Sequence, residues 1–227
     1  MSLMPFVVAV EPDDLQALKH VVEEGRKAEL EWLAKARENH GVPFLRGKAL
    51  SQARGRIRAE FRELRERGIL AGTRDLVLAR EVRAELKHRG MDRPYEPVPA
   101  EETGKPGRRV GAGPRHYQRS GGEPTPFTAR MAVRLPAALG EQLVRACYWT
   151  SAPAVQALWE WQARWGDGPT VILREAQRRN AVTVLDLLCA VLAPRPDADS
   201  ILERAKLQDQ VVTTGDVIRA ALKRAIR

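Results

Sequence analysis

The sequence predicts a mainly α-helical protein: an N-terminal three-helix region, a Pro/Gly-rich linker, and a C-terminal multi-helix region with one short strand. Two observations support this class. Apolar residues recur at helical spacing over most of both flanking regions, and seven of the 15 prolines and six of the 17 glycines fall between residues 91 and 127. Proline and glycine interrupt regular structure. The expected domains are therefore residues 1–90, a flexible basic linker at 91–127, and residues 128–227.

Three helices are expected in the first region. An acidic start followed by spaced leucines predicts a helix over residues 11–39, because carboxylates stabilise the positive end of a helix dipole. A second periodic series covers 48–68. Thr73 is a suitable N-cap for a third helix, which stops at Gly90. Residues 6–10 form a candidate strand.

The C-terminal region begins with a strand over residues 128–136, where apolar and polar side chains alternate. Pro136 then opens one helix, and Ser151 with Pro153 opens another, since proline is favoured in the first turn of a helix. Further helices are expected over residues 170–180, 183–192, 199–208 and 214–226.

Charge points to a polyanionic partner. The chain has 38 basic and 29 acidic residues, a formal net charge of +9 and a pI near 10.1. Arginine supplies 30 of the 38 basic residues. A GC-rich bacterial genome also produces an excess of arginine. The net charge alone is therefore weak evidence for a polyanionic partner, and the positions of the arginines have to be considered.

The sequence leads us to expect that several classes of protein can be excluded. Two cysteines, Cys147 and Cys189, do not make a disulfide framework, and no apolar run is long enough for a signal peptide or a membrane span. Catalytic, cofactor-binding and metal-binding motifs are missing from the sequence. We therefore expect a cytoplasmic, nucleoid-associated protein that is not an enzyme, uses no cofactor or metal, and has no membrane partner.

Residues 128–165 follow the order strand, proline, helix, turn, helix, and the strand ends in Arg-Leu-Pro at 134–136. This segment resembles the ribbon-helix-helix family of DNA-binding proteins. The resemblance implies a homodimer whose paired strands enter the major groove of duplex DNA. It places Thr128, Arg130 and Arg134 on the reading face, and it directs the backbone N–H groups at the helix start around Ser151 toward a phosphate.

Three further basic features could track a phosphate backbone. One helical stripe consists of Arg54, Arg58, Arg62 and Arg65, with a salt-bridged solvent face as the alternative because glutamates lie nearby. The linker carries Arg108, Arg109, Arg115 and Arg119, which could order along a groove or serve only solubility. The last helix presents Arg219, Lys223, Arg224 and Arg227, which a solvated helix terminus explains equally well.

The leading functional interpretation is a bacterial duplex-DNA-binding protein that regulates transcription or acts as an architectural, recombination or partition accessory factor. The alternative is a helical adaptor whose Trp-rich region, residues 148–165, docks a protein partner, because aromatic residues are enriched at interfaces. RNA binding is a third hypothesis. The sequence does not select the biological process, the target site or the partner.

Overall fold

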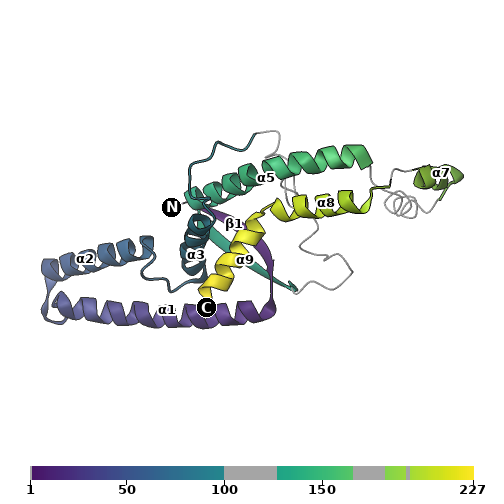
Figure 1. The fold of residues 1–227 in the computed structure, drawn as a ribbon. Coiled ribbons are helices and arrows are strands. Elements are labelled where there is room, and N and C mark those ends of the chain that lie inside the picture. The colour runs from purple at the N-terminus through teal and green to yellow at the C-terminus, as the bar shows by residue number, and fades with distance from the viewer. Residues whose placement is uncertain (1, 100–126, 166–181, 193–194) are drawn as a thin grey trace. The chain divides into compact units, whose positions relative to one another are not determined.

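The structure is a computed structural model, and it describes residues 2–99, 127–165, 182–192 and 195–227 (Figure 1). The described residues are mainly helical, with seven α-helices and one two-stranded antiparallel sheet. In chain order the elements are β1 (Leu3–Val10), α1 (Pro12–Asn39), the 3-10 turn η1 (Val42–Phe44), α2 (Gly47–Glu66), α3 (Arg74–His88), β2 (Ala129–Pro136), α5 (Ala137–Trp165), α7 (Val184–Leu192), α8 (Ala198–Gln210) and α9 (Thr214–Ala225).

The short strand expected in the C-terminal region, at residues 128–136, is confirmed as β2, and it has a partner within the chain. β1 runs antiparallel to it, with Phe6 opposite Val133 and Val8 opposite Met131. The candidate strand at residues 6–10 is therefore a real and longer strand. Its signal is weak in the sequence because apolar residues occupy both faces: Val8 is buried, whereas Val7 is 71% exposed.

The expected helix start at Ser151 is also wrong. α5 continues from Ala137 to Trp165 with Pro153 inside it. An interior proline removes one backbone hydrogen bond and normally disfavours a helix. Here Ala154 and Val155, directly after the proline, pack against Val211, and this tertiary contact holds the segment helical.

The described elements form two compact units that differ from the expected division of the chain. The first contains β1, α1, η1, α2, α3, β2, the start of α5 through Ala146, and α9. The second contains α5 from Cys147 onward, α7 and α8. Segments from residues 128–227 thus join the N-terminal elements, because β2 pairs with β1 and α9 packs on α3.

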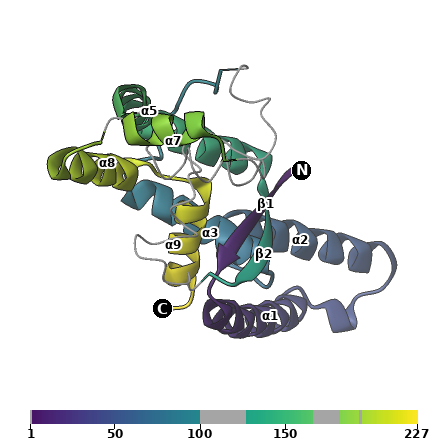
Figure 2. The same ribbon diagram turned by 90° about the vertical axis from the view of Figure 1, so that its right-hand side faces the viewer.

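The core of the first unit lies between the sheet and the helices α3 and α9 (Figure 2). Alternate residues of each strand face this core, as the period of a strand requires. Apolar residues of α3 and α9 meet there, as their helical spacing predicts. The largest fully buried side chains include Leu78, Val82 and Leu86 of α3 and Ile218 and Leu222 of α9.

Helices α1 and α2 form a hairpin within the first unit (Figures 1 and 2). Gly41 has φ +63°, a left-handed conformation that glycine adopts without strain, and it starts the turn η1 that reverses the chain. Trp32 of α1 packs on Phe61 of α2 with ring centroids 5.6 Å apart. This contact fixes which face of α2 points toward α1 and which points to solvent.

The second unit has a small core. Ala154, Val155 and Val211 are buried together, and Leu158 packs against them. The helices expected over 183–192, 199–208 and 214–226 are confirmed as α7, α8 and α9, the last of which belongs to the first unit. The expected helix at 170–180 and most of the expected linker lie outside the described residues.

Candidate nucleic-acid interface

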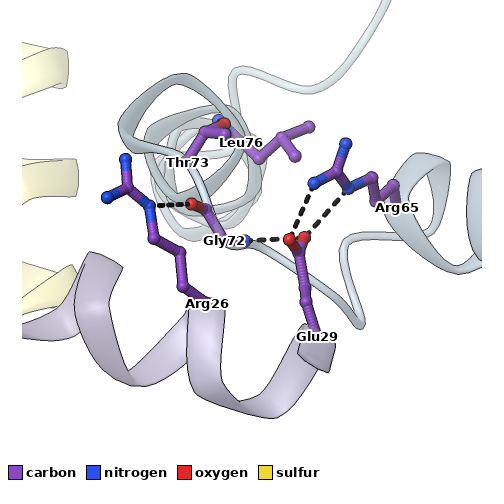
Figure 3. Close-up of polar contacts among 6 residues, drawn as sticks. All are labelled: Arg26, Glu29, Arg65, Gly72, Thr73 and Leu76. Carbon is purple, nitrogen blue, oxygen red and sulfur yellow. Dashed lines mark hydrogen bonds and ion pairs between the residues drawn. The ribbon is translucent and has the colours of Figure 1, made fainter. Parts of the chain in front are cut away.

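Arg65, the last member of the predicted arginine stripe, is committed to an internal contact (Figure 3). Its Nε donates to Glu29 Oε1 at 2.9 Å and its Nη2 to Glu29 Oε2 at 2.7 Å. The guanidinium also lies 4.5 Å from the centre of the Phe61 ring. Such two-point contacts are among the strongest that arginine makes. Arg65 therefore joins α2 to α1.

The same carboxylate holds the segment that leads into α3 (Figure 3). Gly72 donates its N–H to Glu29 Oε1 at 2.9 Å, and its carbonyl accepts from Arg26 Nε at 3.2 Å. A Cβ on Gly72 would clash with the Glu29 carboxylate, so a larger residue there would displace this side chain from its contacts. Thr73 then caps α3 by accepting the N–H of Leu76 at 3.3 Å, as predicted.

Burial raises the pKa of Glu29, but its partners outweigh that effect. Hydrogen bonds from Arg65 and from the Gly72 N–H, with the charges of Arg65 and Arg26, hold the pKa below the usual value of 4.5. The carboxylate is thus charged at neutral pH and stabilises the junction of α1, α2 and the start of α3.

The other three members of the stripe are in a different environment. Arg54, Arg58 and Arg62 are exposed, and each makes no hydrogen bond or ion pair with any residue that the structure describes. They recur every four residues on one side of α2, so their Cα atoms are about 6 Å apart along the helix axis. Ala53 and Ile57, which are buried, anchor the adjoining face of the helix.

The nearby acids do not neutralise this stripe. Glu60 faces His40 at 3.2 Å, and Glu63 pairs with Arg67 at 3.6 Å. The alternative of a salt-bridged solvent face therefore applies to the end of α2. Residues 46–58 contain five basic side chains and no acid.

The β2 residues of the predicted reading face are exposed on the sheet. Arg134 lies opposite Pro5, which has no N–H to donate, so the Arg134 backbone faces the outer edge of the strand. There its N–H donates to Asp75 Oδ1 at 3.1 Å and its Nε to Oδ2 at 3.2 Å. Asp75 thus accepts the free backbone N–H at the strand edge and offsets the positive charge of Arg134. Thr128 and Arg130 are exposed.

Ser151 is fully buried within α5 and is not at a helix start. Its Oγ donates to the carbonyl of Val212 at 3.0 Å and accepts the N–H of Val212 at 2.8 Å. The backbone N–H of a residue inside a helix is used by the helix itself. Ser151 therefore fixes α5 to the segment after α8 and does not offer a phosphate site.

Replacing Ser151 by alanine is expected to lower the free energy of unfolding of the second unit by about 1–2 kcal/mol, because both polar groups of Val212 lose their partner. Four of the five tryptophans lie in this unit, so urea denaturation followed by tryptophan fluorescence measures the change. Ser51→Ala, at an exposed position of α2, is the matched control and should change little. Equal stability of the two variants would contradict the role given to Ser151.

The basic residues of α9 are engaged within the chain. Lys223 Nζ donates to Asp14 at 2.9 Å and Glu11 at 3.2 Å, and Arg224 Nη2 donates to Glu85 at 2.9 Å. Arg219 donates to the carbonyl of Ala9 at 3.1 Å. Sequence reasoning could not find these contacts, because the partners lie more than 100 residues away.

These contacts also shift the pKa values of Lys223 and Glu85. Hydrogen bonding to Asp14 and then to Glu11 raises the pKa of Lys223 above its usual 10.5. Burial raises the pKa of Glu85, but hydrogen bonds and charges of Arg89 and Arg224 outweigh it and place the pKa below 4.5. The last helix is therefore held by ion pairs to both α1 and α3.

The Trp-rich segment is partly used in packing. Trp161 is buried, donates Nε1–H to the Ser200 carbonyl at 2.9 Å, and is covered by the Arg204 guanidinium at 4.6 Å. Trp159 is 57% exposed. The linker arginines predicted as contacts, Arg108, Arg109, Arg115 and Arg119, lie outside the described residues.

No protein-family model, curated protein or solved structure matches the chain. Among the helices in the described ranges, none has both the length and the apolar character required to cross a bilayer. The described residues also contain no group of three or more His, Cys, Asp or Glu side chains placed to hold a metal ion.

Proposed function

We propose that the protein binds duplex DNA through the exposed arginine stripe of α2, Arg54, Arg58 and Arg62. One observation supports this most strongly: the basic residues of α9 and Arg65 are paired inside the first unit, whereas the stripe is exposed and unpaired among the described residues. Positive charge without an internal partner is the charge available to phosphates.

Repulsion among the three arginines of the stripe destabilises α2, and a bound anion reduces this repulsion. Like charges four residues apart on a helix destabilise it by about 0.2–0.5 kcal/mol per pair, and the stripe contains two such pairs. Phosphates on one DNA strand advance by about 3.4 Å per base pair along the duplex axis. Steps of about 6 Å along α2 therefore let successive arginines approach different phosphates.

Contacts to phosphates position a protein and carry little sequence information. Base reading would need a second element. Arg130, on the exposed face of the sheet, and Thr128, just before β2, are the proposed candidates, with Arg134 partly offset by Asp75. Regulation of transcription, DNA architecture, recombination and partition are all compatible with such an interface. The ribbon-helix-helix relationship, and the homodimer that it implies, stay predictions.

Replacing Arg54, Arg58 and Arg62 together by glutamine is expected to weaken duplex binding and reduce its salt dependence. Each phosphate neutralised contributes about −0.9 to the slope of log K against log salt, so the slope should become shallower by about 2.7. Fluorescence anisotropy with a labelled duplex across a salt series measures it. All three side chains are exposed, so the fold should be retained.

The matched control removes three other exposed charges of the first unit, Lys27, Arg83 and Lys87, by the same change to glutamine. Net charge falls equally in both triple variants. Under the proposal the control keeps nearly the wild-type slope. Equal slopes in the two triple variants, or a wild-type chain that fails to bind duplex at low salt, would overturn it.

The adaptor alternative rests on the exposed ring of Trp159. It predicts a protein partner whose binding is lost in Trp159→Ala and is unaffected by the arginine triple variant. Pull-down with each variant separates the two proposals, because the arginine stripe lies in the first unit and Trp159 in the second.

A further inference from the structure

Helix α7 is apolar around most of its circumference and yet exposed. Asp186 is its single charged residue. Its apolar residues include the series i, i+3, i+4, i+7 and i+8 that is typical of a helix packed into a core, formed by Val184, Leu187, Leu188, Val191 and Leu192. The large aliphatic side chains from residue 182 to 192 are between 49% and 77% exposed.

The unit that contains α7 has little core of its own. Its buried apolar residues in the described ranges are Cys147, Ala154, Val155, Trp161 and Val211. α8 contributes no buried residue and exposes Ile201 and Leu202. The first unit, in contrast, buries apolar side chains from both strands and from α1, α2, α3, α5 and α9. Exposed apolar patches of this kind mark association surfaces.

We propose that a second copy of this chain covers α7 and the apolar side chains of α8, so that the second unit is a homodimerisation surface. The apolar character of the exposed side chains favours a second copy of the chain as the partner. Interfaces with transient partners are about as apolar as ordinary protein surface, whereas homodimer interfaces are more apolar. Asp186, the one charged side chain of α7, accepts hydrogen bonds from the N–H and hydroxyl of Thr183 at the helix start, so the rest of α7 offers no charge to select a charged partner.

The exposed area matches what a stable pair requires. Burial of one aliphatic side chain removes on the order of 60–120 Å² from water. Seven such side chains at these exposures, with Ile201 and Leu202, therefore offer about 330–660 Å². A standard interface buries about 800 Å² per partner. With about 65% apolar area in a homodimer, about 500 Å² of it is apolar.

This dimer differs from the one that a paired ribbon implies. β2 already has β1 as a neighbour on one edge, and Asp75 caps the Arg134 N–H on the other. The proposed surface lies on the second unit, whereas the arginine stripe lies on the first. The inference therefore does not depend on DNA binding.

Sedimentation velocity of the full-length chain over a concentration series tests the proposal. The wild type is expected to sediment with twice the 25.4 kDa mass of one chain. Leu188→Asp with Val191→Asp should weaken dimerisation by about a hundredfold or more, because each unpaired carboxylate would be buried in an apolar interface. Leu3→Asp with Val7→Asp changes two exposed apolar residues of the first unit and should leave the dimer intact.

Cys189 gives a second readout. It is exposed on α7, whereas Cys147 is buried, so a short bismaleimide should link Cys189 of two copies in the wild type and in the control variant. The link should disappear in the Leu188→Asp, Val191→Asp variant. A wild-type chain that stays monomeric at every concentration would overturn the proposal. So would a dimer that survives both α7 substitutions.

Discussion

Replacing Ile218 by alanine is expected to lower the free energy of unfolding of the first unit by about 2–5 kcal/mol. Ile218 is fully buried in α9, where it lies among Val217, Ala221 and Leu222, which are also fully buried. α9 closes the core by packing on α3 and β1. The alanine would leave a cavity in the fully buried contact of α9 with α3 and β1, because surrounding side chains relax only partially into such a space.

Urea denaturation followed by far-UV circular dichroism measures this change. Ile226→Ala is the matched control, because it makes the same substitution at a half-buried position just beyond α9. Its expected cost is about 1 kcal/mol or less. If Ile226→Ala destabilised the chain as much as Ile218→Ala, the role of α9 as the closing element of the core would be contradicted.

The second large effect is expected for Glu29→Ala, which should cost about 2–3 kcal/mol at neutral pH. Removing one partner of a buried ion pair costs about 3–5 kcal/mol. The Arg65 side chain is 36% exposed and can regain some hydration, which places the expected effect at or below the lower limit of this range. The Gly72 N–H would also lose its acceptor. Glu31→Ala, at an exposed position of the same helix, should be nearly neutral.

This cost should depend on pH in a defined direction. The pKa of Glu29 is lower in the folded chain than its usual value of 4.5, so its contribution is complete above 4.5 and is lost as the pH falls through the folded pKa. The difference in unfolding free energy between wild type and Glu29→Ala should therefore shrink below pH 4.5. A difference that stays constant down to pH 2 would show that Glu29 does not act through its charge.

Local patterns predicted the helices well because their signals lie within the elements themselves. The acidic start of α1, the Thr73 cap of α3 and the apolar spacing of α9 are all adjacent in sequence to what they specify. The continuity of α5 was missed for a different reason. Pro153 carries a strong local signal for a break, but packing of Val155 against Val211 overrides it.

The candidate site was predicted in part. The spacing of Arg54, Arg58 and Arg62 placed them on one side of α2, and they are exposed there. Nothing in the spacing distinguished Arg65, whose commitment depends on Glu29, 36 residues away. Likewise, the engagement of Lys223 depends on Asp14 at the other end of the chain. Tertiary contacts therefore determine which arginines are available to bind phosphates.

Arginine footprinting tests whether duplex DNA contacts Arg54, Arg58 and Arg62. The full-length chain is treated with phenylglyoxal in the presence and absence of duplex DNA, and modification of each arginine is read by mass spectrometry. We expect Arg54, Arg58 and Arg62 to react rapidly in the free chain and to be protected by DNA. Arg65 and Arg224, held by carboxylates, should react slowly in both conditions. If DNA protected other arginines and left the stripe as reactive as before, the stripe would not be the DNA-binding surface.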